Sequence, residues 1–126
     1  MLSRVYRESP QRLAPLFAKS TKYMMLGWLP PERRRANHER YARHLLYGDP
    51  AGRFSVLSLV WDHGQESPIH GHHTWCAVGV YQGMLTETHY KEGAAGEPPV
   101  ETGSARHAAG ASTFDAGAGI HRIANY

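Results

Sequence analysis

Three histidines in the second half of the chain carry the chemistry that this sequence can support. His70 and His72 stand two residues apart in a strand-like segment. Because side chains alternate along a strand, both point to the same face, with Cβ atoms roughly 6–7 Å apart, so they can share one metal ion. A third ligand must come from elsewhere, and His121 lies in another short strand-like segment, GAGIHRIANY. Imidazole suits Zn, Fe, Cu and Ni, so the ligand type alone does not select the metal.

The neighbouring His73 points to the opposite face of the same strand, and we exclude it as a ligand. Nine of the 126 residues are histidine. For the His-x-His pair alone, chance clustering of histidines is therefore as good an interpretation as a metal site.

The elements that must position these histidines are mostly β-strands. Strand-like segments with Gly-rich turns follow Gly48, and they predict an all-β barrel or jelly roll. The predicted strands are 53–61, one or two within 69–82, 84–90, 100–102, 112–114 and 120–123, with a turn at 62–64 and a loop at 93–99. Before Gly48, residues 10–27 and 31–47 are predicted to form two helices, the second starting at Pro30-Pro31-Glu32. We expect one domain, 1–126, with a helical segment (1–48) packed on a barrel (49–126).

Composition narrows the classes of partner. The formal charge is only +3, and the one dense basic run, 33–35, lies beside Glu32, so a solvated face explains it better than a nucleic-acid surface. No apolar run is long enough for a membrane span, and the N-terminus lacks the apolar core of a secretory signal. A single cysteine, Cys76, fits a reducing cytosol, so we expect a cytoplasmic protein.

The spacing around the histidines resembles the two motifs of the cupin superfamily. Gly64 is followed by five residues, His70-x-His72, three residues, Cys76, six residues and Gly83, as in the first motif. Gly110 stands eleven residues before His121, and Asn125 follows His121 after three, as in the second motif. Ala116 and Ala118 replace the Pro and Gly that the second motif usually has.

Cys76 stands where most cupins have a carboxylate ligand, and this substitution resembles the cysteine dioxygenase family. The flanking segments RFSVLSLVW, SPIHGHHTWCAVGVYQGMLTETHY and IHRIAN are similar to that family as well, and the resemblance covers about residues 38–126. It implies a cupin double-stranded β-helix with Fe(II) on His70, His72 and His121. The implied activity is oxidation of L-cysteine by O₂ to cysteine sulfinate, with a catalytic role for Cys76.

The resemblance also implies a cation for the substrate carboxylate. In the cysteine-selective members an Arg on the helix before the first strand binds it, and Gln takes that place in members that prefer 3-mercaptopropionate. Arg43 is the matching residue here, and its planar fork suits a carboxylate. A solvent-facing Arg is the alternative interpretation. Arg53 and Arg122 are near the site in sequence, but Arg122 follows His121 and should point away.

Two departures from the family accompany this resemblance. Gly71 replaces the Asp that usually lies between the first two histidines and orients them. The chain ends at Tyr126, before the family's final Ser-x-His-x-Tyr strand, and Tyr126 is too close to Asn125 to be that tyrosine. Cys76 should therefore lack a tyrosine partner. A missing strand would expose a sheet edge, so we expect a homodimer or a poorly stable protein, which a stable monomer in gel filtration would contradict.

Three alternatives stay open at this point. A dioxygenase for 3-mercaptopropionate or another small thiol keeps the chemistry and changes the substrate. A non-catalytic cupin that binds a metal or a small ligand keeps only the fold. Zinc hydrolysis at a three-His site is less favoured, because no dedicated general base stands nearby.

Overall fold

The computed structural model describes residues 29–126, and the helix predicted for 10–27 lies outside this range. The described part is nearly all β, consistent with a cupin-type β fold. After the short 3₁₀ helix η1 (Pro31–Arg34), the strands are β1 (Ala42–Gly48), β2 (Ser55–Val60), β3 (His70–Gly71), β4 (Cys76–Gly79), β5 (Met84–Lys91), β6 (Val100–Ala108), β7 (Ser112–Asp115) and β8 (Ile120–Ala124). Within residues 29–126, no helix has the length and apolar character needed to cross a bilayer.

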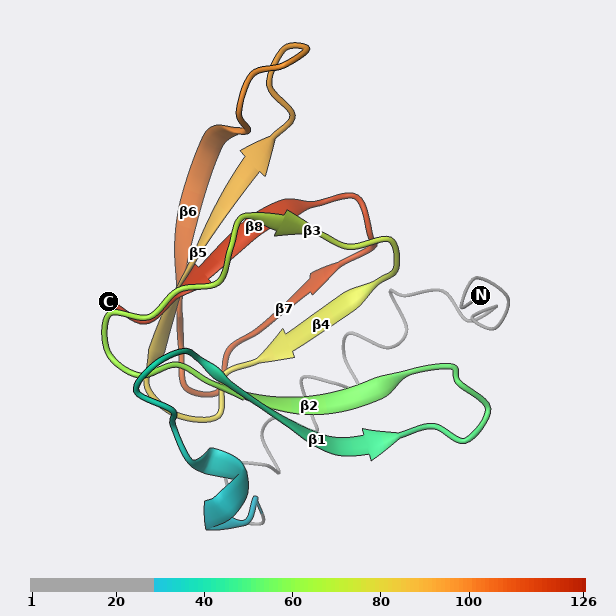
Figure 1. Ribbon diagram of the computed structural model, residues 1–126, viewed down its shortest axis with the longest axis vertical. Helices are drawn as coiled ribbons and strands as arrows, with labels where there is room; N and C mark the ends of the chain where they lie inside the picture. Colours follow the sequence, from blue (N-terminus) through green and yellow to red (C-terminus); the bar gives the residue numbers. More distant parts are fainter. Residues whose placement is uncertain (1–28) are drawn as a thin grey trace.

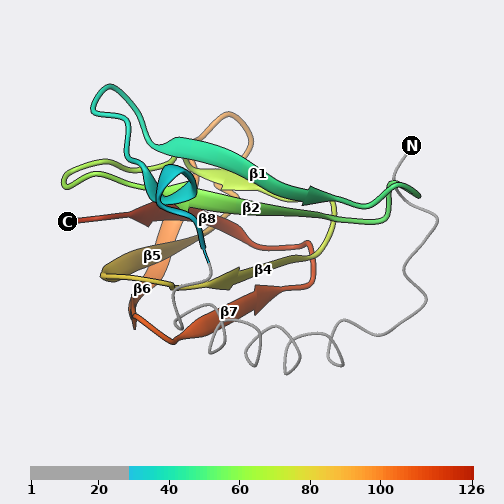
Figure 2. The same ribbon diagram turned by 90° about the horizontal axis from the view of Figure 1, so that it is seen from below.

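The strands form three antiparallel groups. β1 pairs with β2, β4 pairs with β7, and a four-stranded sheet has the order β3-β8-β5-β6. Figure 1 shows the long β5–β6 hairpin rising above the rest, while the β1–β2 hairpin lies at the opposite end. Seen from below, β1–β2 and β4–β7 lie as separate layers (Figure 2). The four-stranded sheet is the part that carries two of the three sequence-predicted ligands.

The helix predicted for residues 31–47 is wrong. Only its first turn is helical, as η1, and Ala42–Gly48 is instead strand β1, paired antiparallel with β2 from Ala42↔Val60 to Gly48↔Ser55. Pro at the start of η1 explains the helical turn that the sequence indicated. Beyond it, the pairing with β2 determines the conformation, because a short apolar stretch such as Leu45-Leu46 satisfies either periodicity.

The strand predicted for 53–61 is confirmed as β2, but it is not buried on both faces. Its burial alternates strictly, with Val56 and Val60 half-buried and Leu57 and Leu59 at 36% and 38% exposed. The other predicted strands are confirmed as β3 to β8, and β6 is much longer than the predicted 100–102. The expected turn at 62–64 and loop at 93–99 are present as well.

Residues 64–67 run beside the end of β8 and determine where that strand lies. The backbone N–H of Gly64 donates to the Asn125 carbonyl, and the Asn125 N–H donates to the Gln65 carbonyl, at 2.7 and 3.0 Å. Ser67 and Ile123 are joined by a backbone bond and by a bond from Ile123 N–H to the Ser67 hydroxyl. The cupin-motif residues Gly64 and Asn125 are thus in direct contact, so the two motifs meet at this point.

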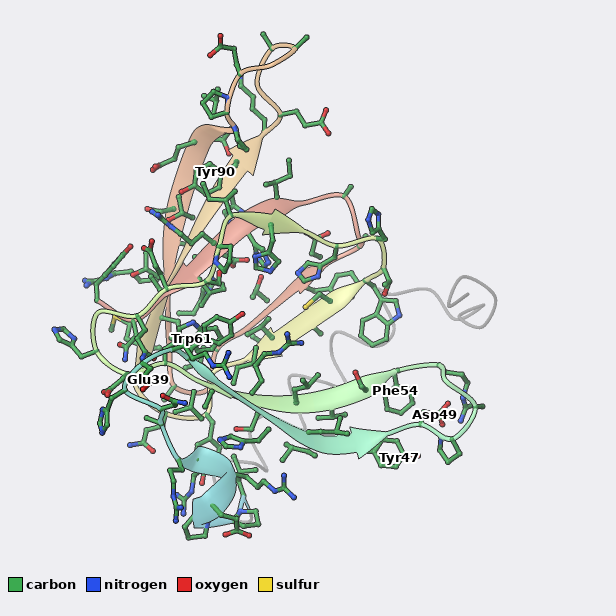
Figure 3. The ribbon with its side chains drawn as sticks, in the orientation of Figure 1. Glu39, Tyr47, Asp49, Phe54, Trp61 and Tyr90 are labelled. Atoms are coloured by element: carbon green, nitrogen blue, oxygen red, sulfur yellow. The ribbon has the colours of Figure 1, made fainter. Side chains whose placement is uncertain are left out.

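A buried carboxylate organises the turn between β1 and β2. Asp49 accepts the Arg53 backbone N–H at 3.0 Å and two guanidinium N–H bonds at 2.7 and 2.8 Å. Next to this turn the rings of Tyr47 and Phe54 pack with centroids 5.6 Å apart, and Figure 3 shows both beside Asp49. The Arg53 side chain lowers the pKa of Asp49 to about 2.

We predict that Asp49→Asn lowers the Tm of the protein at neutral pH by weakening this turn. Because the folded pKa of Asp49 lies below its ordinary value of 3.8, its contribution is present above pH 3.8 and is lost as the pH falls through about 2. The difference in Tm between the wild type and the variant should therefore become smaller as the pH is lowered from 3.8 to about 2. Thermal unfolding followed by circular dichroism measures it. Glu97→Gln, in the exposed β5–β6 loop, is the control, and a pH-independent difference for Asp49→Asn would contradict the assignment.

Candidate metal centre

Three imidazoles converge in the structure, as the sequence predicted. One possible ligand atom from each of His70, His72 and His121 lies within 4.8 Å of the other two, and the ring centroids are 4.8–5.2 Å apart. His121 is buried and the other two are half-buried, so the group has an inner wall and an open side. Cys76, Asp115 and Glu87 are not part of this group, and His73 beside it is exposed.

The register of the four-stranded sheet brings two of the three histidines together. His70 on β3 stands directly opposite His121 on β8. His72 follows β3 by one residue, and its ring turns back toward His121. Both histidines reach the cluster as predicted, but only His70 is inside a strand, so strand alternation does not explain the position of His72.

Hydrogen bonds to the outer nitrogens aim the lone pairs of the rings at a common point. His70 Nδ1 is 2.8 Å from the Pro68 carbonyl, which only accepts, so Nδ1 carries the proton and Nε2 is the lone-pair nitrogen. His121 Nδ1 is 2.6 Å from a carboxylate oxygen of Glu87, which leaves Nε2 of His121 facing the cluster in the same way. This is the protonation pattern that metal-ligating histidines adopt.

The nitrogens that face each other fit the donor set of one cation. His72 Nε2 and His121 Nε2 are 3.1 Å apart. Two nitrogens at right angles around one ion, each about 2.1 Å from it, would be separated by about 3 Å. Burial lowers the pKa of His72, and the nearby His70 and His121 lower it further, so His72 is neutral at pH 7. Three imidazoles whose inner nitrogens converge fit a metal ion.

Glu87 supports the cluster from behind, and sequence reasoning missed it. It lies on β5 beside β8, is 3% exposed, and accepts hydrogen bonds from His121 and from His107 Nε2 at 2.9 Å. The bond from His121 lowers the pKa of Glu87 against the effect of burial, and the bond from His107 adds to this. The sequence did show a charged residue, Glu87, inside a predicted strand. Alternation alone does not tell which face of that strand is buried, so it did not identify Glu87 as a partner of a histidine.

The loop before β8 is shaped by a second carboxylate that the sequence did not single out. Asp115 Oδ1 accepts the backbone N–H groups of Gly117, Ala118 and Gly119 at 2.6, 3.1 and 3.3 Å. Burial would raise the pKa of Asp115, but these three N–H groups hold it below its ordinary value. A Cβ at Gly119 would come within 1.9 Å of Asp115 Oδ2, so a larger residue would have to displace this carboxylate. This loop directly precedes β8 and so determines where His121 lies.

Cys76 lies beside the histidines but not among the possible ligands. It is the cross-strand partner of Asp115, and with Glu87 and His121 it lines a small hollow, together with Val78, Thr113 and Phe114. Burial raises the pKa of the Cys76 thiol, and the negative charges of Asp115 and Glu87 raise it further. The thiol is therefore neutral at pH 7. The hydroxyl of Tyr126 contacts Glu66, in agreement with the expectation that Tyr126 is not a partner of Cys76.

The arginines considered in the sequence lie in different places. Arg43 is on β1, not on a helix, opposite Leu59, and its side chain is exposed. It belongs to a different sheet from His70 and His121. Arg53 holds the β1–β2 turn, and Arg122 pairs with Glu66 at 3.3 Å, pointing away from the cluster as expected.

The comparison with known families agrees with this geometry. A family described as Cysteine dioxygenase type I matches residues 22–126, which is most of the chain and includes all three clustered histidines and Cys76. The family is one of dioxygenases, and a cluster of three histidines fits a metal site typical of it. The resemblance seen in the motifs is thus confirmed over a longer stretch than the residues that first indicated it. The chain belongs to the cysteine dioxygenase type I family.

Proposed function

We propose that this protein is a non-haem iron thiol dioxygenase that oxidises L-cysteine with O₂ to cysteine sulfinate. Both atoms of one O₂ molecule are transferred to the sulfur, which loses its proton, so that a thiol and O₂ become a sulfinate and H⁺. Fe(II) held by His70, His72 and His121 would supply the redox chemistry that lets O₂ react with the thiol. The single observation that carries the proposal is the convergence of three imidazoles from one family-matched segment.

The charge of the donor set favours a thiol substrate. Many non-haem iron oxygenases bind the metal through two histidines and a carboxylate. Among residues 29–126 the three possible ligands are all imidazoles, so the cation would keep its full charge and an open side. An anionic substrate would then be bound most strongly, and contact with a cation favours the thiolate form of a thiol.

Cys76 fits this scheme as a neutral neighbour of the substrate. A carboxylate at its position would compete with the substrate thiolate for the positive charge. The raised pKa keeps the Cys76 thiol protonated, so it adds no negative charge to the site. We propose that Cys76 contacts the substrate from the hollow that it lines with His121.

Arg43 is our candidate for binding the substrate carboxylate. Its guanidinium is exposed, and no ion pair joins it to an acidic group within residues 29–126. An arginine binds a carboxylate with two parallel hydrogen bonds, which favours a substrate with a carboxylate over a simple thiol. Because 3-mercaptopropionate carries a carboxylate as well, that acid or another small thiol stays the alternative substrate. A cytoplasmic location and a homodimer stay predictions.

We predict that the full-length protein, freed of metal, binds one Fe(II) or Co(II) ion per chain. His72→Ala should weaken this binding by roughly 100-fold or more, since substitutions even outside the direct ligands cost about 10–100-fold. Competition titration with a chelator measures the affinity. His73→Ala is a matched control, because His73 is adjacent in sequence and exposed. Equal losses in the two variants would contradict the assignment of the ligands.

We predict that the iron-loaded protein consumes one O₂ per cysteine and forms a product that is heavier by two oxygen atoms. With ¹⁸O₂, mass spectrometry should find both labelled atoms in the sulfinate. An oxygen electrode, with and without cysteine, gives the stoichiometry. Iron binding without thiol-dependent O₂ uptake would contradict the proposal and support a non-catalytic metal-binding protein.

We predict that Arg43→Gln reduces kcat/KM for cysteine more than for 3-mercaptopropionate. Both thiols carry a carboxylate, but Gln stands at the matching position in the family members that prefer 3-mercaptopropionate. A difference of at least tenfold between the two losses corresponds to about 1.4 kcal/mol of discrimination. Arg40→Gln, an exposed arginine three residues earlier, is the control. Equal losses for the two thiols would reject the role of Arg43 in substrate selection.

A further inference from the structure

A buried carboxylate joins the histidine cluster to a fourth histidine that the proposed function does not use. Glu87 Oε1 is 2.6 Å from His121 Nδ1, and Glu87 Oε2 is 2.9 Å from His107 Nε2. The side chains of His121 and Glu87 are 6% and 4% exposed, whereas that of His107 is 19% exposed. These residues come from the adjacent strands β8, β5 and β6, so the hydrogen bonds cross the sheet to its edge strand.

We propose that His107 and Glu87 are positioning residues that orient His121 for metal binding. His107 holds the carboxylate of Glu87, and Glu87 holds the proton of His121 on Nδ1, so that Nε2 of His121 presents its lone pair to the cluster. This inference rests on the proposed role of His121 as a metal ligand. It adds His107, on the edge strand β6, to the residues that support the histidine cluster.

The need for His107 follows from the freedom of a glutamate side chain. The terminal torsion of Glu is broad, so one hydrogen bond from His121 leaves the plane of the carboxylate poorly defined. A second hydrogen bond, on the other oxygen, restricts that rotation. It also satisfies Oε2, which would otherwise be a buried carboxylate oxygen with no donor at hydrogen-bond distance among the contacts within residues 29–126.

The carboxylate also compensates for what the donor set lacks. Three imidazoles bring no negative charge to a cation. The carboxylate of Glu87 is the nearby negative charge, and it is hydrogen-bonded to the outer nitrogen of His121. A carboxylate that accepts the outer N–H of a ligating histidine makes that histidine a stronger donor. Glu87 thus acts through His121 and leaves the open side of the cluster for the substrate.

His89 provides an internal contrast to His107. It stands on β5 directly opposite His121, and its Nε2 is 3.8 Å from the same Glu87 oxygen that His107 contacts. This distance is beyond a hydrogen bond, and the His89 side chain is 49% exposed. Since both histidines are near Glu87 but only His107 is bonded to it, a substitution at each separates a specific role from a general effect of removing a nearby imidazole.

The test compares His107→Leu, His107→Gln and His89→Leu in the full-length protein. In the metal-free protein, nitrogen NMR of the histidine rings reports which nitrogen of His121 carries the proton. We expect His121 to be protonated on Nδ1 in the wild type and in His89→Leu, and to populate both tautomers in His107→Leu. Affinity for Co(II) should fall roughly tenfold in His107→Leu. His107→Gln should recover most of the loss, because its amide N–H can replace Nε2–H.

The possible results separate the two proposals. A His121 tautomer and a Co(II) affinity that are unchanged in His107→Leu would overturn the positioning role, as would an equal effect of His89→Leu. If no variant and no wild-type protein binds Co(II), the metal assignment fails, while the tautomer measurement still decides whether His107 orients His121. If His107→Leu does not fold, Glu87→Gln keeps the shape and removes the charge. It should lower the Co(II) affinity by about 10–100-fold, and an unchanged affinity would overturn the proposal.

Discussion

The alignment of residues 64–71 against residues 120–125 is the constraint on which the histidine cluster depends. Backbone bonds at Gly64 and Asn125 hold one end of this alignment, and the pairing of His70 with His121 forms the other. Because side chains alternate, a shift of one residue would turn His121 away from the face that it shares with His70. The glycine and asparagine of the two motifs therefore act through backbone register rather than through direct contact with a ligand.

Within residues 29–126, charge is distributed around the cluster in a way that leaves no anionic group among its possible ligands. Glu87 and Asp115 are both held ionised by donors, Glu87 by two imidazoles and Asp115 by three backbone N–H groups. Neither belongs to the group of possible ligands. Burial raises the pKa of the Cys76 thiol, and the two negative charges raise it further. The carboxylates thus shape and orient the site, and the anionic position remains for the thiol substrate of the proposed reaction.

The error at residues 31–47 shows where local sequence signals stop being sufficient. Pro31 and Glu32 favour a helical turn, and η1 forms there. Residues 42–48 instead form a strand because they pair with β2, with one register shift between Leu45 and Tyr47. That pairing joins residues such as Ala42 and Val60, which are far apart in the chain, and no local pattern encodes it. The same error placed Arg43 on a helix, although it is an exposed residue of β1.

The sequence by itself determined the strands after Gly48, the three histidines and the family, because strand alternation and the Gly-His-His-Cys spacing are local properties of the chain. Only the tertiary structure revealed the hydrogen bonds of Glu87, His107 and Asp115. Each contacts a partner that comes from a neighbouring strand or loop. The sequence pattern around a glutamate in a strand is the same whether its side chain faces water or an imidazole. The face that a strand buries is decided by the sheet around it.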